Sequence, residues 1–254
     1  MRDIRLCIRD NIELGLKVAE KYNLGIEVQE FKNPRFEFEK SPYRYKYMKI
    51  KKRSLHAPFG DLAFGSVDPL LREVALKRIT DAYRDAEKHE FREVIIHHGF
   101  VPFTSPEEKW IKRSTEFWKN NMNRFEGTPK ICIENMLDNS FEVIRDLIDS
   151  IDDDRIKICL DLGHANCFSN IDVMEWIKGL NDRIAYIHMH NNYGNRDEHN
   201  GLKNGNIRYE DVLECIEKYC PNAVLAIETR GVDLESSFLF LNNLLNHGFD
   251  NENC

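Results

Sequence analysis

Side chains that can bind a metal ion or move a proton recur in this chain at one kind of position, the end of a short apolar segment. Seven segments close on such a residue, namely Glu30, His56, His97, Glu134, Asp161, His188 and Glu228. Three more lie in the loops that follow, namely His164, Asp197 and His199. Carboxylates and imidazoles buried this close together would repel one another or lose their charge without a compensating cation. The pattern predicts a divalent metal site, and its nitrogen and oxygen donors suit Zn²⁺, Mn²⁺, Co²⁺ or Fe²⁺ better than Ca²⁺.

The segments that carry these residues alternate with longer amphipathic segments. Strands are expected at 3–8, 25–31, 53–59, 92–98, 129–135, 156–162, 183–190 and 223–229. Helices are expected at 11–23, 68–89, 105–122, 140–151, 172–180, 209–219 and 234–247. This alternation implies parallel strands joined by crossover helices, and eight such units in 254 residues match a TIM barrel. We therefore predict an α/β fold, a single-domain (β/α)8 barrel over residues 1–254, with an open doubly wound sheet as the alternative.

The direction of each side chain follows from the alternation along a strand. Only one of the neighbours His97 and His98 can face the interior of the barrel. His188 and His190 face the same way, so their spacing does not choose between them. Cys132 shares a face with Glu134, and such small inward residues predict a packing layer beneath a polar rim.

Composition limits the classes of partner. The net charge of −7 argues against a nucleic-acid-binding protein, although the run at 40–53 is locally basic. No apolar run is long enough to cross a membrane, and the charged start of the chain is unlike a secretory signal, so the cytoplasm is the expected location. Seven cysteines without a CxxC pair predict reduced thiols.

An ordered series of motifs carries a resemblance to a known family. The motifs are LHAPF (55–59), VIIHHG (94–99), CIENM (132–136), CLDLGHAN (159–166), YIHMHNN (186–192), RDEH (196–199) and AIETR (226–230). In this series the chain resembles the xylose-isomerase-like TIM barrels, also called AP endonuclease family 2. That family includes sugar and sugar-phosphate isomerases and epimerases, and also endonuclease IV, which cleaves DNA at apurinic and apyrimidinic sites.

The resemblance implies a metal-dependent sugar or sugar-phosphate isomerase or epimerase of carbohydrate metabolism. Its core metal, with Zn²⁺ or Mn²⁺ as the best candidates, would be held by Glu134, Asp161, His188 and Glu228. Glu134 and Glu228 would also act as acid and base on opposite faces of the sugar, with the metal stabilising an enediolate. His164 would contact a substrate hydroxyl. Two cations, Lys203 and Arg230, are expected to hold a phosphate or carboxylate of the substrate.

The nuclease branch of the family supplies the alternative, a trinuclear-zinc phosphodiesterase that acts on abasic DNA. The positions that match its nine ligands are His56, His97, Glu134, Asp161, His164, His188, Asp197, His199 and Glu228. Two departures favour small-molecule chemistry: the expected Asp-Thr-Cys-His segment reads Asp-Leu-Gly-His at 161–164, and Phe59 replaces an expected tyrosine. A non-catalytic metal- or sugar-binding barrel is the third hypothesis. The number of metal ions, from one to three, the sugar and the oligomeric state are left open.

Overall fold

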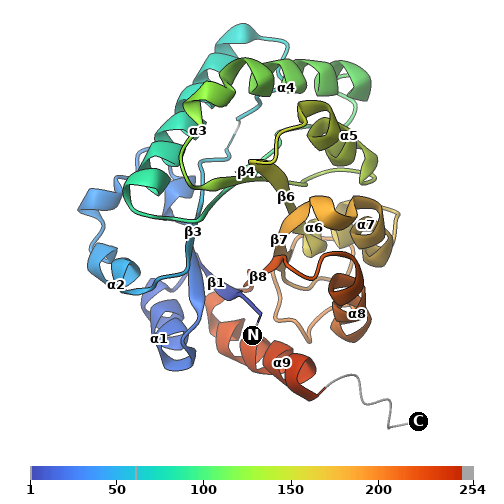
Figure 1. The fold of residues 1–254 in the computed structure, drawn as a ribbon. Helices are drawn as coiled ribbons and strands as arrows, with labels where there is room; N and C mark the ends of the chain where they lie inside the picture. Colours follow the sequence, from blue (N-terminus) through green and yellow to red (C-terminus); the bar gives the residue numbers. More distant parts are fainter. Residues whose placement is uncertain (1, 61, 248–254) are drawn as a thin grey trace.

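Eight parallel strands close on themselves in the computed structural model, which describes residues 2–60 and 62–247. Each strand pairs with the next one in sequence, and β8 pairs with β1, so the sheet has no free edge (Figure 1). The strands are β1 Ile4–Ile8, β2 Gly25–Val28, β3 Arg53–His56, β4 Glu93–His97, β5 Lys130–Glu134, β6 Ile156–Asp161, β7 Ile184–Met189 and β8 Val224–Ile227. The predicted (β/α)8 barrel is confirmed.

The helices form an outer layer around the barrel (Figure 1). The seven expected from the sequence are α1 Ile12–Tyr22, α3 Pro69–Lys88, α4 Glu107–Asn121, α5 Glu142–Ile151, α7 Val173–Leu180, α8 Tyr209–Tyr219 and α9 Leu234–His247. The second connection contains only two 3-10 turns, η1 Glu30–Lys32 and η2 Phe38–Lys40, and the short α2 Arg44–Lys49. One further short helix, α6 Leu162–Phe168, was not expected. None of the described helices is long and apolar enough to cross a membrane.

Helix α3 shows how local sequence sets these elements. Asp68 accepts a hydrogen bond from the Leu70 amide at 2.8 Å, and Pro69 occupies the first turn, where its missing N–H costs nothing. The alanines at 75, 82 and 86 and Ile79 are buried at helical spacing and pack into the main hydrophobic core. Further 3-10 turns lie at η3 Met122–Arg124, η4 Asn181–Arg183 and η5 Gly231–Asp233.

The barrel interior is built in layers. A small apolar layer fills its middle and consists of Cys7, Ile95, Cys132, Cys159, Tyr186, Val224 and Ala226. This confirms the inward packing predicted for Cys132, and Cys159 packs in the same layer. The six cysteines within the described residues are free thiols. The strand register then places His97 level with Glu134, and Asp161 level with His188, one layer higher. The polar rim therefore lies directly on top of the apolar layer.

Below the apolar layer, Arg5 and Glu93 form a buried ion pair. One guanidinium nitrogen of Arg5 lies 3.1 Å from Glu93 Oε1, a second contacts Oε2, and the Arg5 side chain is 1% exposed. Removal of one partner from a buried pair leaves an uncompensated charge, which is far more destabilising than loss of the pair itself.

We expect Glu93→Gln to lower the free energy of unfolding by about 3–5 kcal/mol, because Arg5 keeps its charge without its main partner. Urea denaturation followed by circular dichroism measures this loss. The matched control is Glu235→Gln, which removes a carboxylate that pairs with Lys21 at 2.8 Å on the surface. That variant should keep the wild-type unfolding midpoint, and equal midpoints for both variants would contradict the assigned role of the buried pair.

Candidate metal centre

Four of the predicted ligands converge at the carboxyl ends of their strands. His188 Nδ1 lies 3.1 Å from Glu134 Oε1, 3.3 Å from Glu228 Oε2 and 3.7 Å from Asp161 Oδ2. One donor atom of each of the four residues lies within 4.8 Å of the others, and all four side chains are buried. We refer to this set as the core group. Its geometry suits one divalent cation surrounded by nitrogen and oxygen donors.

A residue of β2 supports the core group from below. Glu27 is completely buried, and its Oε2 lies 2.9 Å from His188 Nε2. A carboxylate can only accept, so Nε2 carries a hydrogen, and Nδ1 faces the other three residues, where loss of its proton would free a lone pair for a metal ion. This is the arrangement in which metal-binding histidines are usually found. Gln29 Nε2 completes the support, because it donates to Glu27 Oε1 at 2.9 Å and to Glu228 Oε1 at 2.6 Å.

Two further groups of coordinating side chains adjoin the core group. His56 and His97 place their Nε2 atoms 3.2 Å and 3.3 Å from Glu134 Oε2, so Glu134 belongs to both groups. On the other side, Asp197 Oδ2 lies 3.1 Å from His199 Nε2 and 3.5 Å from His164 Nε2. The structure therefore brings all nine sequence-predicted coordinating residues into three adjoining groups at one end of the barrel.

The electrostatics keep the carboxylates charged. Burial alone would raise the pKa of Glu134, but His188 and His97 outweigh it and hold that pKa well below its usual value. Burial is likewise opposed at Asp161, where His164 and other neighbours lower the pKa to about 2. At neutral pH these carboxylates are therefore anionic, as metal ligands must be.

The histidines divide into two kinds. Burial lowers the pKa of His97 to about 3, so His97 is neutral and has a lone pair to offer. Burial also disfavours charge on His188, but Cys159 and Glu27 raise its pKa well above the usual value. A proton on His188 would therefore compete with a metal ion, and metal affinity should rise with pH.

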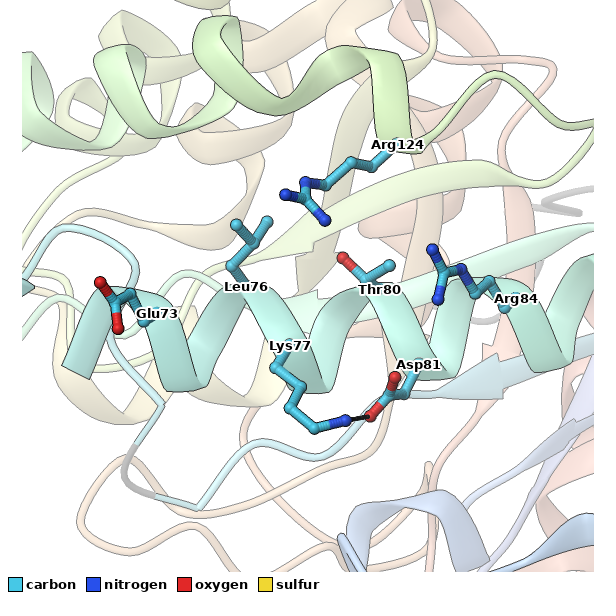
Figure 2. A pocket seen from close by; sticks show the side chains of 7 residues that line it. All are labelled: Glu73, Leu76, Lys77, Thr80, Asp81, Arg84 and Arg124. Carbon is cyan, nitrogen blue, oxygen red and sulfur yellow. Dashed lines mark hydrogen bonds and ion pairs between the residues drawn. The ribbon is translucent and has the colours of Figure 1, made fainter. Parts of the chain in front are cut away.

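A cavity of about 220 Å³ opens above these groups. Its lining contains coordinating residues of all three groups, together with Gln29, Met136, Phe59, Arg9 and Lys32. A larger hollow of about 300 Å³ lies on the outer side of α3 (Figure 2). It is lined by no histidine, and Lys77 there already donates to Asp81 at 2.7 Å. The donor atoms that metal chemistry requires therefore belong to the cavity at the strand ends.

The two predicted substrate cations lie elsewhere. Lys203 is exposed and its amine lies 4.9 Å from the centre of the Phe240 ring on α9. Arg230 is exposed and its Nε donates to the Glu198 carbonyl at 3.2 Å. Neither lines the cavity, whereas Arg9 and Lys32, which the sequence did not single out, do.

The structure shows which of the histidines at the strand ends point into the barrel. His97 faces the core group, while His98 turns outward and donates from Nε2 to Asp138 at 2.6 Å. Both His188 and His190 face inward: His190 Nε2 lies 3.1 Å from Asp161 Oδ1. Glu30 does not end β2 but begins η1, and it accepts from the Tyr47 hydroxyl at 2.7 Å, away from the cavity lining. Sequence reasoning missed Glu27, which supports His188. The feature that could have indicated it is an acidic residue inside an otherwise apolar strand.

We expect Glu27→Gln to weaken Zn²⁺ binding by about 10–100-fold, because a neutral amide orients and polarises His188 less well than a carboxylate. Competition with a chromophoric chelator measures the affinity. Glu30→Gln is the matched control, since it makes the same change three residues later outside the cavity. An unchanged affinity in Glu27→Gln, or an equal loss in both variants, would rule out this role for Glu27.

Comparisons with known proteins place the chain in a family. The family model of the xylose isomerase-like TIM barrel matches residues 24–243. The uncharacterized protein MJ1311 of Methanocaldococcus jannaschii is 29% identical over 213 residues, which cover 76% of this chain and 71% of that protein. Among solved structures, a D-tagatose 3-epimerase-like protein superposes with a TM-score of 0.79 at 23% identity, over 96% of this chain and 97% of the other. The TTHB071 protein from Thermus thermophilus, soaked with ZnCl₂, superposes with a TM-score of 0.78 at 22% identity, over 97% and 99%. This chain belongs to the xylose isomerase-like TIM barrel family.

Proposed function

We propose that this protein is a metal-dependent isomerase or epimerase of a sugar or sugar phosphate. The observation that carries the proposal is that two buried glutamates from different strands, Glu134 on β5 and Glu228 after β8, line the same small cavity, with donor atoms within 4.8 Å of each other. Two carboxylates that face each other across a substrate can remove a proton from one side of a carbon and return one from the other. That exchange inverts or moves a stereocentre next to a carbonyl.

The core group fits a divalent cation. Three anionic carboxylates and one imidazole, whose Nδ1 faces them, form a donor set that requires positive charge, either a proton on the imidazole or a metal ion. Glu134, Asp161, His188 and Glu228 would hold the ion. Once bound, the cation would supply positive charge beside the oxygen on which negative charge develops when a proton leaves the neighbouring carbon.

The two glutamates have different surroundings, which suggests different tasks. Glu228 accepts from Gln29 and has Arg9 Nη1 at 3.9 Å, and both neighbours favour its anionic form. We therefore assign to Glu228 the removal of the substrate proton. Glu134 lies beside the Nε2 atoms of His56 and His97, and we assign to it the second proton transfer, for which the anionic Glu134 must first take up a proton.

The size and charge of the cavity indicate the class of substrate. About 220 Å³ lies below the range of ordinary drug-sized pockets, roughly 300–1,000 Å³, and suits a molecule the size of a monosaccharide. Arg9 and Lys32 at its rim can attract a phosphate, and the many polar lining groups can bind hydroxyls.

Several cations of the basic run at 40–53 are already engaged within the protein. Lys40 pairs with Glu37 at 2.7 Å, and Arg44 pairs with Glu39 at 3.0 Å. Arg53 is buried and donates to the His89 carbonyl at 2.7 Å. These charges are already compensated by the protein, which favours a small substrate over a nucleic acid.

One observation favours a second candidate, a phosphodiesterase acting on abasic DNA. The three adjoining groups of coordinating residues share Glu134 or contact the core group, as expected for a cluster of several metal ions. Such clusters are suited to the displacement of an alcohol from a phosphate ester.

We expect Glu228→Gln and Glu134→Gln each to lower the rate of substrate proton exchange by about 100-fold or more, because each removes one proton-transferring group. The assay incubates ketoses, aldoses and their phosphates in D₂O with Zn²⁺ or Mn²⁺ and follows loss of the C–H signal by NMR. Chelator treatment should abolish exchange, and added metal should restore it.

The Glu30→Gln protein serves as control, and metal content is measured in every variant to separate loss of metal from loss of proton transfer. Exchange at the wild-type rate in Glu228→Gln would overturn the assignment. Absence of exchange together with cleavage of an abasic oligonucleotide would establish the second candidate. Binding of sugar or metal without either reaction would indicate a non-catalytic barrel.

Charge at the rim gives a separate prediction about phosphate. We expect Lys32→Gln to raise the KM for a phosphorylated substrate about tenfold or more, with little change for the unphosphorylated sugar, because one charge-assisted hydrogen bond is lost. Lys203→Gln makes the same change beside Phe240 and should leave both KM values unchanged. The opposite result would restore Lys203 as the substrate cation.

A further inference from the structure

The hollow on the outer side of α3 is separate from the candidate metal centre. It has a volume of about 300 Å³ and shares no lining residue with the cavity at the strand ends. Six of its lining residues come from one face of α3, and the seventh, Arg124, comes from η3, just before β5 (Figure 2). A site formed here would therefore have a ligand of its own, whichever reaction the barrel mouth performs.

Two arginines in this hollow have no anionic partner among the residues that the structure describes. Lys77 pairs with Asp81 at 2.7 Å, whereas Arg84 and Arg124 form no ion pair within that part of the chain. Figure 2 shows both arginine side chains extending toward Thr80. Two guanidinium groups that share one hollow repel each other, and an anion bound between them removes that repulsion.

A buried hydroxyl lies at the same place. Thr80 is only 4% exposed, and its Oγ1 forms no hydrogen bond with any of the described residues. In the middle of a helix such a hydroxyl commonly bonds to the carbonyl four residues earlier, which here belongs to Leu76. A buried hydroxyl without a partner costs free energy. A ligand oxygen in the hollow that accepts from Thr80 would therefore stabilise the protein.

We propose that Thr80, Arg84 and Arg124 bind the phosphate group of a small, hydroxylated phosphate monoester. Guanidinium groups bind phosphate oxygens through paired, charge-assisted hydrogen bonds, and the threonine hydroxyl would donate one more. The phosphate of a monoester has three strong acceptor oxygens, one for each of these three side chains, whereas a carboxylate has two. The donor set therefore suits a phosphate better than a carboxylate.

The rest of the hollow indicates what is attached to the phosphate. Pockets of about 300 Å³ and above hold whole small molecules, so the hollow has room for more than a phosphate ion. Glu73 also lines it, seven residues before Thr80 and thus about 10 Å away along the axis of α3. At that distance its carboxylate can accept a hydrogen bond from a hydroxyl of the same ligand, with Leu76 between the two ends. A polyol phosphate has these features.

Calorimetric titration with ribitol 5-phosphate, which has no carbonyl and cannot undergo the proposed isomerisation, tests the site. The protein is treated with a chelator and carries Lys32→Gln, which removes the phosphate contact expected at the barrel mouth. We expect Arg124→Gln to weaken binding about tenfold or more, because a charge-assisted hydrogen bond is lost. Arg35→Gln is the matched control, since Arg35 is exposed but lies outside the hollow. No binding, or equal affinity in these two variants, would overturn the proposal.

Thr80→Val separates a binding role of the hydroxyl from a structural one. Valine has nearly the same shape, so the ligand-free variant should melt at the same temperature as the parent protein or higher, because the partnerless hydroxyl is gone. Ribitol 5-phosphate should bind about tenfold or more weakly and raise the melting temperature less than in the parent protein. A lower melting temperature without ligand, or an unchanged affinity, would contradict the role assigned to Thr80.

Inorganic phosphate distinguishes a free ion from a monoester as the ligand. We expect it to bind more weakly than ribitol 5-phosphate, and we expect Glu73→Ala to weaken binding of the monoester but not of the ion. Equal affinities for both ligands, with no effect of Glu73→Ala, would identify free phosphate as the ligand and overturn the assignment of a monoester. None of these readouts involves turnover or a metal ion, so failure here would leave the proposed isomerase reaction standing.

Discussion

Concentrated negative charge around one imidazole is the constraint on which the structure of this barrel mouth depends. Glu27, Glu134, Asp161 and Glu228 all lie within 3.7 Å of a nitrogen of His188, and all are buried. Carboxylates taken out of water remain charged only when cations or strong donors surround them. The arrangement is therefore stable when positive charge is present, either as protons on histidines or as a divalent ion.

Closure of the barrel brings these charged side chains together at one level. An apolar layer lies directly beneath them. Parallel strands of nearly equal length end at one level, so residues from β2, β5, β6, β7 and β8 meet there. Immediately below, Cys132, Cys159 and Ala226 fill the interior with small apolar groups. The carboxylates above this layer interact mainly with the histidines and the cavity. The hydrophobic packing of helices on strands offsets the cost of this polar centre.

The sequence alone predicts those site residues that lie at strand ends and whose direction follows from the alternation of side chains along a strand. All eight strands were located, and parity limited the fourth strand to one inward histidine, which is His97. Glu27 was missed because an acid within a strand does not mark an end, whereas Glu30 was chosen because β2 was predicted to run to residue 31, three residues beyond its end at Val28. Lys203 illustrates a different limit. Loop positions have no period, so spacing could not indicate that Lys203 packs on Phe240 or that Arg9 and Lys32 reach the cavity.

Hydrogen bonds through Asp161 and Asn135 connect the core group with the neighbouring residues His164 and His190. Asn135 Oδ1 accepts from the Asp161 amide at 2.7 Å, and its own carbonyl accepts from His164 Nδ1. Asp161 in turn accepts from the His164 amide at 2.7 Å and contacts His190. A shift of Asp161 would therefore move the atoms that hold His164 and His190 in place. Because these hydrogen bonds join the two sets of side chains, the position of each set constrains the other, so the core group and its neighbours form one connected polar network at the barrel mouth.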